Sequence, residues 1–480
     1  MPLVAGFDSS TGATKVEVRD ADDGTLVAHG RAPHPETTPP RSEQDPEAWW
    51  RALQDAMDSA GVRDPVAAVS VAGQQHGMVV TDARSSPLRA AKLWNDTESA
   101  PQARELRDTW GPRRWAERTG SVPVASFTVT KLAWLRAHEP EVLAAAARVC
   151  LPHDWLTWRL CGELVTDRGD ASGTGYWSPE DGAWALDALT LVDTEVDWPA
   201  MLPRVLGPGD VAGSASLDGR DVVVAPGTGD NMAAALGLGM RPGDVAISLG
   251  TSGTVYAVTA SPTADASGAV AGFADATGRF LPLVCTLNAT GVVSWVKRIL
   301  GVDTAGIDAL ALTAPPGSDG AVMVPYLAGE RTPDLPDASG HVGGIRPDTS
   351  QAAVARAAFG GVVGGLLDGI DALSAAGVAV SPAGRLFLVG GGARSPAFRE
   401  IAAHLSGRTI TVPDAPEHVA AGACVQAAAV LAGDAPAAVA ARGHVVAGRE
   451  HRAAAGGATA AEVRDAYAAQ RDRLYPPGDA

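Results

Sequence analysis

The sequence predicts an α/β protein of two domains, each a mixed sheet flanked by helices. Three observations support this prediction. Apolar runs typical of strands alternate along the chain with stretches of helical periodicity. A hairpin rich in Ser, Thr and Gly opens each half, at 4–18 and 245–258. The length of 480 residues exceeds what one ordinary hydrophobic core supports.

Composition and charge narrow the classes of function. The net charge of −17 argues against a nucleic-acid or anionic-membrane partner, because both would be repelled. The first residues have neither the basic region nor the apolar region of a signal peptide, and no uncharged run of about 18 apolar residues occurs. The four cysteines lack CxxC spacing, which is typical of reduced thiols. We therefore expect a cytoplasmic protein.

The first half begins with a predicted hairpin over 2–19, followed by a turn and a third strand. Asp45 is a typical N-cap and Pro46 a typical first helical residue, so a helix should start there. Tryptophans and apolar residues then recur at helical spacing. The further elements expected in this half are strands at 66–71 and 222–225, mostly helical structure over 97–161, and an Ala-rich helix ending near 237–239.

The second half repeats this order. After its hairpin, the expected elements are strands at 279–285, 321–325, 386–389 and 408–412, a long helix at 351–375 and a final helix at about 459–474. A Gly-rich joint at 237–243 suggests the domain boundary. The predicted domains are therefore 1–240 and 241–434, followed by a C-terminal extension, 435–480.

The two hairpin turns are candidate phosphate sites, because such turns expose backbone N–H groups and hydroxyls to an anion. Thr11 lies in the first turn, and Gly250 and Thr251 lie in the second. A single Gly-rich turn is more often an ordinary tight turn, and the chain has neither a P-loop motif nor a Rossmann fingerprint. Two similar hairpins are more specific, and they predict a nucleotide phosphate held between two domains.

Two aspartates are candidates for the chemistry. Asp230 follows a strand and lies in the first turn of a helix, where an acid often serves only as a cap. Between Gly-rich residues, it could instead accept the proton of an alcohol that attacks phosphorus. Asp8 ends the first strand. It could form an Asx-turn, or it could hold Mg²⁺ through water.

Polar residues at two positions suit recognition of a polyol. The segment 74–76 places two amides and an imidazole after a buried strand. The segment 94–96 combines an aromatic face with an amide and a carboxylate. Each segment alone is more often structural, so the prediction of a sugar site depends on their combination.

The sequence resembles the FGGY carbohydrate kinases over nearly its whole length, from about Val4 to Gly433. The motifs that carry the resemblance are, in chain order, FDSSTGATKVEV (7–18), SEQDPEAWW (42–50), AGQQHGMV (72–79), LWND (93–96), GTGDN (227–231), SLGTSGTV (248–255), LAGERTP (327–333) and GGGARS (390–395). One departure is the residue after Thr11, which differs in many members, and 435–480 carries no family motif. The second, third and fourth motifs favour xylulose over glycerol, gluconate or ribulose.

The resemblance implies two ribonuclease H-like (actin-like ATPase) domains that close on a sugar and ATP in the cleft between them. The Gly-rich joint at 237–243 is the expected hinge. The resemblance also implies MgATP-dependent phosphorylation of D-xylulose at O5, with Asp230 as the general base. Asp8 is the candidate metal-binding residue because of its place at the end of the first strand. The residues that the resemblance implies for the sugar site are Gln75, His76, Asp230 and Asn231, and the residue pattern adds Trp94 and Asn95 as sugar-binding candidates. Those that it implies for the nucleotide are Thr11, Gly250, Thr251, Gly391, Gly392 and Ala393.

Three other functions are compatible with parts of this sequence. One is an FGGY kinase for another ketose or polyol, such as ribulose, ribitol or arabitol. A second is a sugar or nucleotide sensor, against which Asp230 argues. A third is an actin- or Hsp70-type ATPase, against which the GQQHG, LWND and LAGERTP motifs argue. Both a monomer and a homodimer are compatible with the sequence.

Overall fold

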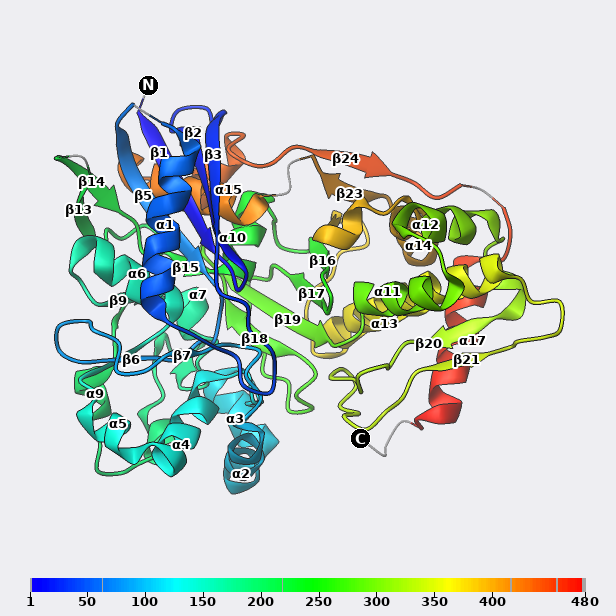
Figure 1. Cartoon of the computed structure of the whole chain (residues 1–480), viewed down its shortest axis with the longest axis horizontal. Coiled ribbons are helices and arrows are strands. Elements are labelled where there is room, and N and C mark those ends of the chain that lie inside the picture. Colours follow the sequence, from blue (N-terminus) through cyan, green and yellow to red (C-terminus); the bar gives the residue numbers. More distant parts are fainter. Residues whose placement is uncertain (1, 63, 218, 415–416, 455, 477–480) are drawn as a thin grey trace. The chain divides into compact units, whose positions relative to one another are not determined.

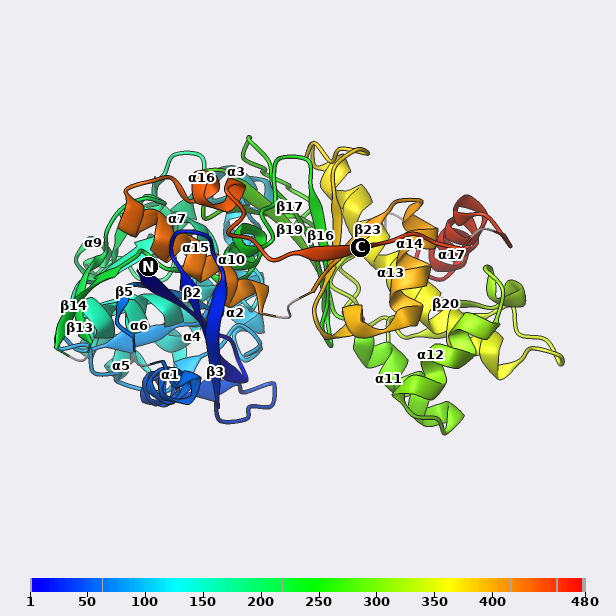
Figure 2. The same ribbon diagram turned by 90° about the horizontal axis from the view of Figure 1, so that it is seen from above.

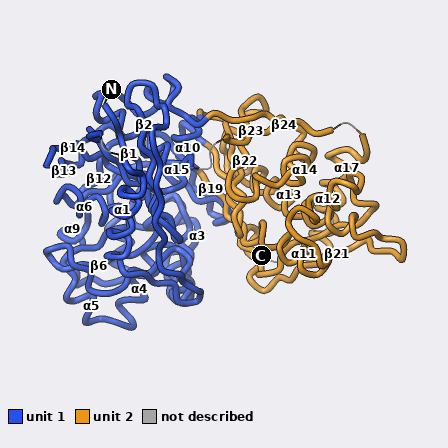
Figure 3. Tube along the Cα trace, turned by 45° about the horizontal axis from the view of Figure 1, so that its top comes forward, with its two compact units in different colours: residues 1–240, 258–281, 417–446 blue, residues 241–257, 282–416, 447–480 orange. Residues whose placement is uncertain are grey.

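The computed structural model describes residues 2–62, 64–217, 219–414, 417–454 and 456–476. These residues form two compact units (Figure 3). Unit 1 comprises 1–240, 258–281 and 417–446, and unit 2 comprises 241–257, 282–416 and 447–480. The first boundary lies in the Gly-rich joint. The units differ from the linear division predicted from the sequence, because two later segments of the chain return to unit 1.

Unit 1 contains most of the elements of the first half of the chain (Figure 1). Its strands are β1 (Leu3–Ser9), β2 (Ala13–Asp20), β3 (Leu26–Pro33), β4 (Glu43–Gln44), β5 (Val66–Gly73), β6 (Val79–Thr81), β7 (Ala91–Lys92), β8 (Arg148–Cys150), β9 (Val165–Asp167), β10 (Trp177–Ser178), β11 (Ala183–Trp184), β12 (Arg204–Leu206), β13 (Gly213–Leu217), β14 (Arg220–Val224), β15 (Thr228–Gly229) and β18 (Ala271–Ala274). Its helices are α1 (Pro46–Ala60), α2 (Ala100–Trp110), α3 (Pro112–Thr119), α4 (Thr128–His138), α5 (Pro140–Ala145), α6 (Pro152–Cys161), α7 (Arg168–Ala171), α8 (Leu186–Thr190), α9 (Trp198–Met201), α10 (Asp230–Gly237), α15 (His418–Ala432) and α16 (Pro436–Ala441).

The central sheet of unit 1 has the order β13-β14-β5-β1-β2-β3, and β15 also pairs with β5. β1 pairs antiparallel with β2 and parallel with β5, and β5 pairs parallel with both β14 and β15. Helix α1 lies on one face of this sheet and α15 on the other (Figures 1 and 2). The sheet is therefore the middle layer of three.

Local sequence explains where α1 begins and ends. The Asp45 carboxylate accepts a hydrogen bond of 3.0 Å from the Glu47 backbone N–H, and Pro46 occupies the first turn. Gly61 ends the helix at a φ of 65°, in the left-handed region that favours glycine. Trp49 and Leu53 are buried against the sheet. The predicted helix start and core face are thus confirmed.

Unit 2 is built on a second sheet. Its strands are β16 (Val245–Leu249), β17 (Gly253–Ala257), β19 (Phe280–Thr286, which crosses the unit boundary), β20 (Val322–Val324), β21 (His341–Gly343), β22 (Leu386–Val389), β23 (Ile410–Pro413) and β24 (Gly448–His451). Its helices are α11 (Thr290–Leu300), α12 (Thr304–Thr313), α13 (Gln351–Ala375), α14 (Pro396–Ser406) and α17 (Ala460–Leu474), with 3₁₀ turns at Ser318–Gly320 and Gly391–Arg394.

The two sheets share one topology. In unit 2 the order runs β19-β17-β16-β22-β23-β24, and the successive pairs are antiparallel, antiparallel, parallel, parallel and antiparallel. The path β3-β2-β1-β5-β14-β13 of unit 1 has the same sequence of pairings. The internal repeat seen in the sequence as two hairpins therefore extends to six strands in each unit.

The C-terminal extension is more ordered than its sequence pattern suggested. β24 adds an antiparallel edge strand to the second sheet, and α16 packs against α15. Helix α17 has the capping box of Thr459 and Glu462, and its Arg464 and Arg471 form ion pairs with Asp371 and Asp368 of α13. The final helix therefore packs back onto unit 2.

Helix α13 alone among the described residues is long and apolar enough to cross a membrane, and 72% of its apolar window is buried within the protein. This burial is the pattern of a core helix. All four cysteines are free thiols.

Close packing of α10 on α15 gives a test of the fold. A Cβ on Gly422 would lie 1.9 Å from the Ala233 carbonyl oxygen, so the two backbones leave no room for a side chain. We expect Gly422→Ala to lower the free energy of unfolding by about 1–3 kcal/mol. Gly360 of α13 meets no atom within 4 Å, so Gly360→Ala should instead stabilise by about 0.5–1 kcal/mol. Urea unfolding measures both, and shifts of the same sign would contradict this packing.

Candidate active site

Polar residues gather where three parallel strands of unit 1 end. β1 and β15 both pair in parallel with β5, and their residues Asp8 and Thr228 are both in register with Ala72. The carboxyl ends of adjacent parallel strands are the usual place for a ligand in an open α/β sheet. This register brings Asp8 and Asp230 to opposite sides of the end of β5.

Asp230 occupies the first turn of α10, as predicted, but does not cap it, since Gly229 is the N-cap residue. Its Oδ1 accepts hydrogen bonds from the backbone N–H of Asn231 (2.8 Å) and from Asn231 Nδ2 (2.9 Å). Both bonds go to the same oxygen. The carboxylate is therefore oriented through Oδ1, which leaves Oδ2 to meet a substrate.

The surroundings of Asp230 favour its protonated form. Burial raises the pKa of this carboxyl to about 7, and the negative charges of Asp8 and Asp170 add to the effect. A pKa close to neutrality is what an efficient general base requires.

The amides beside Asp230 have unused hydrogen-bonding groups. Asn231 Nδ2 donates to Gln75 Oε1 at 2.8 Å. Gln74 Nε2, Gln75 Nε2 and Asn95 Oδ1 are buried and have no hydrogen-bond partner among the described residues. Because an unsatisfied buried polar group costs free energy, these atoms indicate where a polar ligand would bind.

His76 is held in a fixed orientation. It adopts a φ of 65°, and its ring stacks on Phe127 at a centroid distance of 4.9 Å. Nδ1 lies 2.6 Å from the carbonyl oxygen of Gly173, so Nδ1 donates and carries the proton. A neutral ring in this tautomer presents Nε2 as an acceptor. A left-handed backbone at a non-glycine residue is typical of functional sites.

Trp94 links the sugar segment to the first hairpin. Its indole Nε1 donates to Thr11 Oγ1 at 2.9 Å, and the side chain is 38% exposed. Thr11 Oγ1 in turn donates to Gln74 Oε1 at 3.3 Å. Three segments that are distant in the sequence therefore meet at one hydroxyl group.

Lys15 is a residue that the sequence reasoning missed. Its Nζ lies 3.2 Å from Asp8 Oδ2 and 2.9 Å from Glu417 Oε2. Burial lowers the pKa of Lys15, but the two carboxylates outweigh it and the net shift is upward. Lys15 is directly opposite Asp8 in the hairpin register, so counting outward from the turn could have found this pair. The first hairpin therefore offers an anion a lysine ammonium as well as hydroxyl groups.

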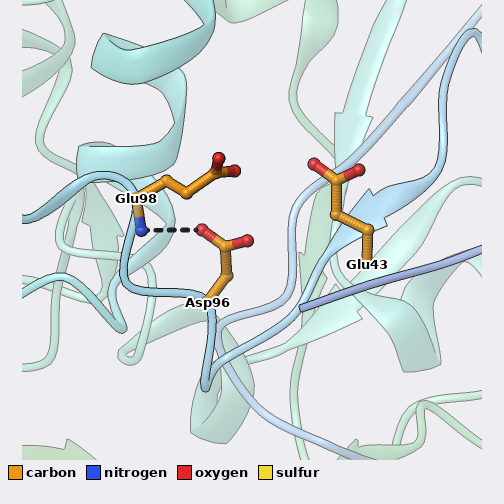
Figure 4. A group of neighbouring side chains, drawn as sticks. All are labelled: Glu43, Asp96 and Glu98. Atoms are coloured by element: carbon orange, nitrogen blue, oxygen red, sulfur yellow. Dashed lines mark hydrogen bonds between the residues drawn. The ribbon is translucent and has the colours of Figure 1, made fainter. Parts of the chain in front are cut away.

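Asp96 belongs to a different group from Trp94 and Asn95. Its carboxylate faces those of Glu43 and Glu98 (Figure 4), an arrangement that resembles a metal centre. The ammonium of Lys92, whose side chain is fully buried, lies 3.2 Å from Asp96, 3.0 Å from Glu43 and 2.5 Å from Glu98. The three carboxylates share this ammonium, and Glu43 also pairs with Arg89 at 2.5 Å, so side-chain cations hold the place that a metal ion would take. The carboxylates fix the loop that carries Trp94, and the suggested sugar-site role of Asp96 is not supported.

Unit 2 contains a cavity of about 520 Å³ at the second hairpin. The predicted residues Gly250, Thr251, Gly391 and Gly392 all line it. The other lining residues are Leu249, Thr290, Val293, Ser294, Lys297, Thr304, Ile307, Asp308, Phe359, Arg394, Ser395 and Phe398. Glycines, hydroxyls and two cations around one cavity suit a nucleotide.

Ala393 differs from its neighbours. Its side chain is buried and does not line the cavity, and its carbonyl oxygen accepts a hydrogen bond from Arg399 Nε. A Cβ on Gly392 would lie 2.6 Å from Leu249 Cβ, which shows how closely the turn approaches β16. Ala393 therefore packs in the interior beneath the turn rather than facing the cavity.

Comparison with known proteins gives matches over the whole fold. A model of the N-terminal domain of the FGGY family of carbohydrate kinases matches residues 3–237, and a model of its C-terminal domain matches 245–431. Xylulose kinases of Streptomyces coelicolor and Streptomyces rubiginosus are both 50% identical to this chain, over 455 and 454 residues, covering 93% of it and 92% of each relative. The crystal structure of xylulose kinase from Bifidobacterium adolescentis has a TM-score of 0.87 at 39% identity, and the match covers 98% of this chain and 99% of that one. The predicted fold class is thereby confirmed.

Replacement of Lys92 tests its role in the acidic group. We expect Lys92→Met to lower the free energy of unfolding by about 3–5 kcal/mol, because it leaves the fully buried carboxylate of Asp96 without its ion-pair partner. Arg113, whose ion pair with Glu117 is exposed, is the matched control, and Arg113→Met should change stability little. Urea unfolding compares the two. Equal losses, or stabilisation of wild-type protein by a divalent cation that Glu98→Gln abolishes, would contradict this interpretation.

Proposed function

Because the chain belongs to the FGGY family of carbohydrate kinases, we propose that it transfers the γ-phosphoryl group of ATP to O5 of D-xylulose. The products are D-xylulose 5-phosphate and ADP. The observation that carries the proposal is the group of polar atoms at the strand ends of unit 1, where Asp230 Oδ2 and the amides of Gln74 and Gln75 are left for a ligand. The identity to curated xylulose kinases supports xylulose as the sugar.

Asp230 acts as the general base. Its Oδ2 accepts the proton of the O5 hydroxyl as that oxygen attacks the γ-phosphorus, and positioning supplies much of the remaining rate enhancement. Asn231 holds Oδ1 through two hydrogen bonds, so the carboxylate does not rotate away from the hydroxyl.

The sugar is bound by amides, an imidazole and an indole. Gln75 Nε2 donates to a sugar hydroxyl and Asn95 Oδ1 accepts from one, which satisfies both buried atoms. The His76 imidazole, held in place by the hydrogen bond from Nδ1 to Gly173, contacts another hydroxyl. The partly exposed face of Trp94 packs on the carbon skeleton. A site of this kind discriminates by leaving its polar groups unpaired when a hydroxyl is missing.

ATP occupies the cavity of unit 2, with Gly250, Thr251, Gly391 and Gly392 beside it. Thr11, in the turn of the first hairpin, is the further residue that we propose for the nucleotide phosphates. The side chain of Asp8 already accepts from Ser10 and Lys15, so it fits Mg²⁺ through a water better than as a direct ligand. When bound, the ion would neutralise part of the negative charge of the phosphates. The ammonium of Lys15 would contribute to the same neutralisation.

The partners of this protein are a small sugar and ATP. The net charge of −17 supports the absence of nucleic-acid and membrane partners. A cytoplasmic location and a monomer or homodimer stay predictions.

A substrate panel tests the proposed function. With ATP and Mg²⁺, ADP release should be fastest with D-xylulose, whose kcat/KM should exceed those for ribulose, ribitol, arabitol, gluconate and glycerol by at least about tenfold, or 1.4 kcal/mol of transition-state preference. A higher value for another sugar would overturn the assignment of the substrate. No release with any of them would overturn the kinase proposal itself.

The pH profile tests the base. Since only the ionised carboxylate accepts a proton, kcat/KM should rise with pH and level off above about 7, the pKa of Asp230. Asp230→Asn should lower kcat by about 10²–10⁴-fold and abolish this rise. Asp45→Asn, which alters another aspartate at a helix start but keeps its cap, is the control. A loss of only a few-fold in Asp230→Asn would assign Asp230 a structural role.

A further inference from the structure

A buried charged cluster in unit 1 supplies no group that contacts the reactants proposed above, although the charge of its Asp170 adds to the raised pKa of Asp230. It consists of His153, Asp154, Asp167 and Asp170, each at most 2% exposed. Removing four ionisable groups from water is costly unless each is paired and hydrogen-bonded. Such a cluster is retained most readily where it fixes one arrangement of the chain.

His153 is the centre of the cluster. Its Nδ1 lies 2.7 Å from Asp170 Oδ2, and its Nε2 lies 3.2 Å from Asp154 Oδ1 and 3.9 Å from Asp167 Oδ1. Burial lowers the pKa of His153, but the carboxylates outweigh it and raise the pKa to about 9. The aspartates therefore favour the protonated form of the ring, while burial raises the pKa of each aspartate in turn.

The side chain of His153 packs closely against the backbone of two active-site segments. A Cβ on Gly73, the last residue of β5, would lie 2.8 Å from His153 Cβ. A Cβ on Gly227, just before β15, would lie 2.5 Å from His153 Cδ2. Neither position has room for a side chain, so the cluster lies directly behind the strand ends.

One path leads from the cluster to Asp230. Asp167 caps α7, its Oδ1 accepting from the backbone N–H of Asp170 at 2.9 Å and its Oδ2 from that of Gly169 at 2.8 Å. The same Oδ2 accepts from Thr228 Oγ1 at 2.7 Å. Thr228 lies in β15, which is only two residues long and runs directly into Asp230. So short a strand restrains its backbone weakly, and the threonine anchor adds to that restraint.

A second path leads to the sugar segment. The backbone carbonyl oxygen of Asp170 accepts from the N–H of Gly173 at 2.9 Å, and the carbonyl oxygen of Gly173 accepts from His76 Nδ1 at 2.6 Å. Helix α7 is the link between them. The cluster is thus connected to the base and to the sugar-binding histidine by separate hydrogen-bonded routes.

We propose that Asp167 and Thr228 are positioning residues, whose hydrogen bond holds β15 so that Asp230 meets the substrate hydroxyl in the reactive orientation. This inference rests on the proposed role of Asp230 in phosphoryl transfer. His153 and Asp170 hold α7 in place and so hold Asp167. Through Gly173, the same helix also fixes the position of His76 relative to Asp230.

Thr228→Val tests the proposal, because it keeps the shape and β-branching of threonine and removes only the hydroxyl. We expect kcat to fall by about tenfold to a hundredfold, as misplacement of a reacting group does, while the KM values for sugar and ATP change by less than about threefold. Thr228→Ser, which restores the hydroxyl, should recover most of kcat. Asp167→Ala combined with Thr228→Val should cost no more in kcat than Asp167→Ala alone, since both remove the hydrogen bond between these two side chains.

Thr119→Val is the matched control. Thr119 is also fully buried, and its hydroxyl donates to the backbone of Trp115 and Ser121, away from the site. Thr119→Val should lower the free energy of unfolding about as much as Thr228→Val does, but it should leave kcat unchanged.

Two results would overturn the proposal: an unchanged kcat in Thr228→Val, or a fall that Thr228→Ser does not recover. The kinetics use whichever sugar wild-type enzyme phosphorylates, so an error in the substrate leaves this test intact. An active Asp230→Asn enzyme would refute the proposed base separately.

Discussion

The register of three parallel strands is the constraint on which the candidate site depends. β5 is the common partner, with β1 on one side and β15 on the other, and both neighbours are aligned at Ala72. A shift of one residue in either pairing would turn alternate side chains to the opposite face and separate Asp8 from Asp230. The burial of the sheet between α1 and α15 enforces this register. The chemistry of the site is therefore a consequence of how the sheet is packed.

Two buried charged groups hold segments that carry residues of the candidate site. Lys92 gathers Glu43, Asp96 and Glu98 under the loop of Trp94, and His153 gathers three aspartates behind β15. Neither group contacts the proposed reacting atoms. Buried ion pairs contribute little net stability, but they tolerate few alternative arrangements. A site whose amides have no hydrogen-bond partner needs rigid support of this kind. Without it, the loops could move together and the amides could hydrogen-bond to each other.

Much of the fold could be predicted because its signals are local. The hairpin turns, the Asp45 cap and the helix at 351–375 each depend on a few adjacent residues. The return of 258–281 and 417–446 to unit 1 depends on packing between distant segments, which no local pattern reports. The same distinction applies to the site. Asp230 and His76 lie in recognisable motifs, whereas the contact of Lys15 with Glu417 and the binding of Asp96 by Lys92 appear only when the chain is folded.

The return of α15 has a consequence for biosynthesis. This helix covers one face of the unit 1 sheet, yet it lies at 418–432, after most of unit 2 has been made. Because a ribosome releases the chain from its N-terminus, β1 and β5 emerge long before the helix that covers them. The apolar face of a nascent sheet must meanwhile be shielded by transient contacts or by chaperones. A chain that stops before residue 418 lacks one whole layer of its first unit, however complete its catalytic motifs are.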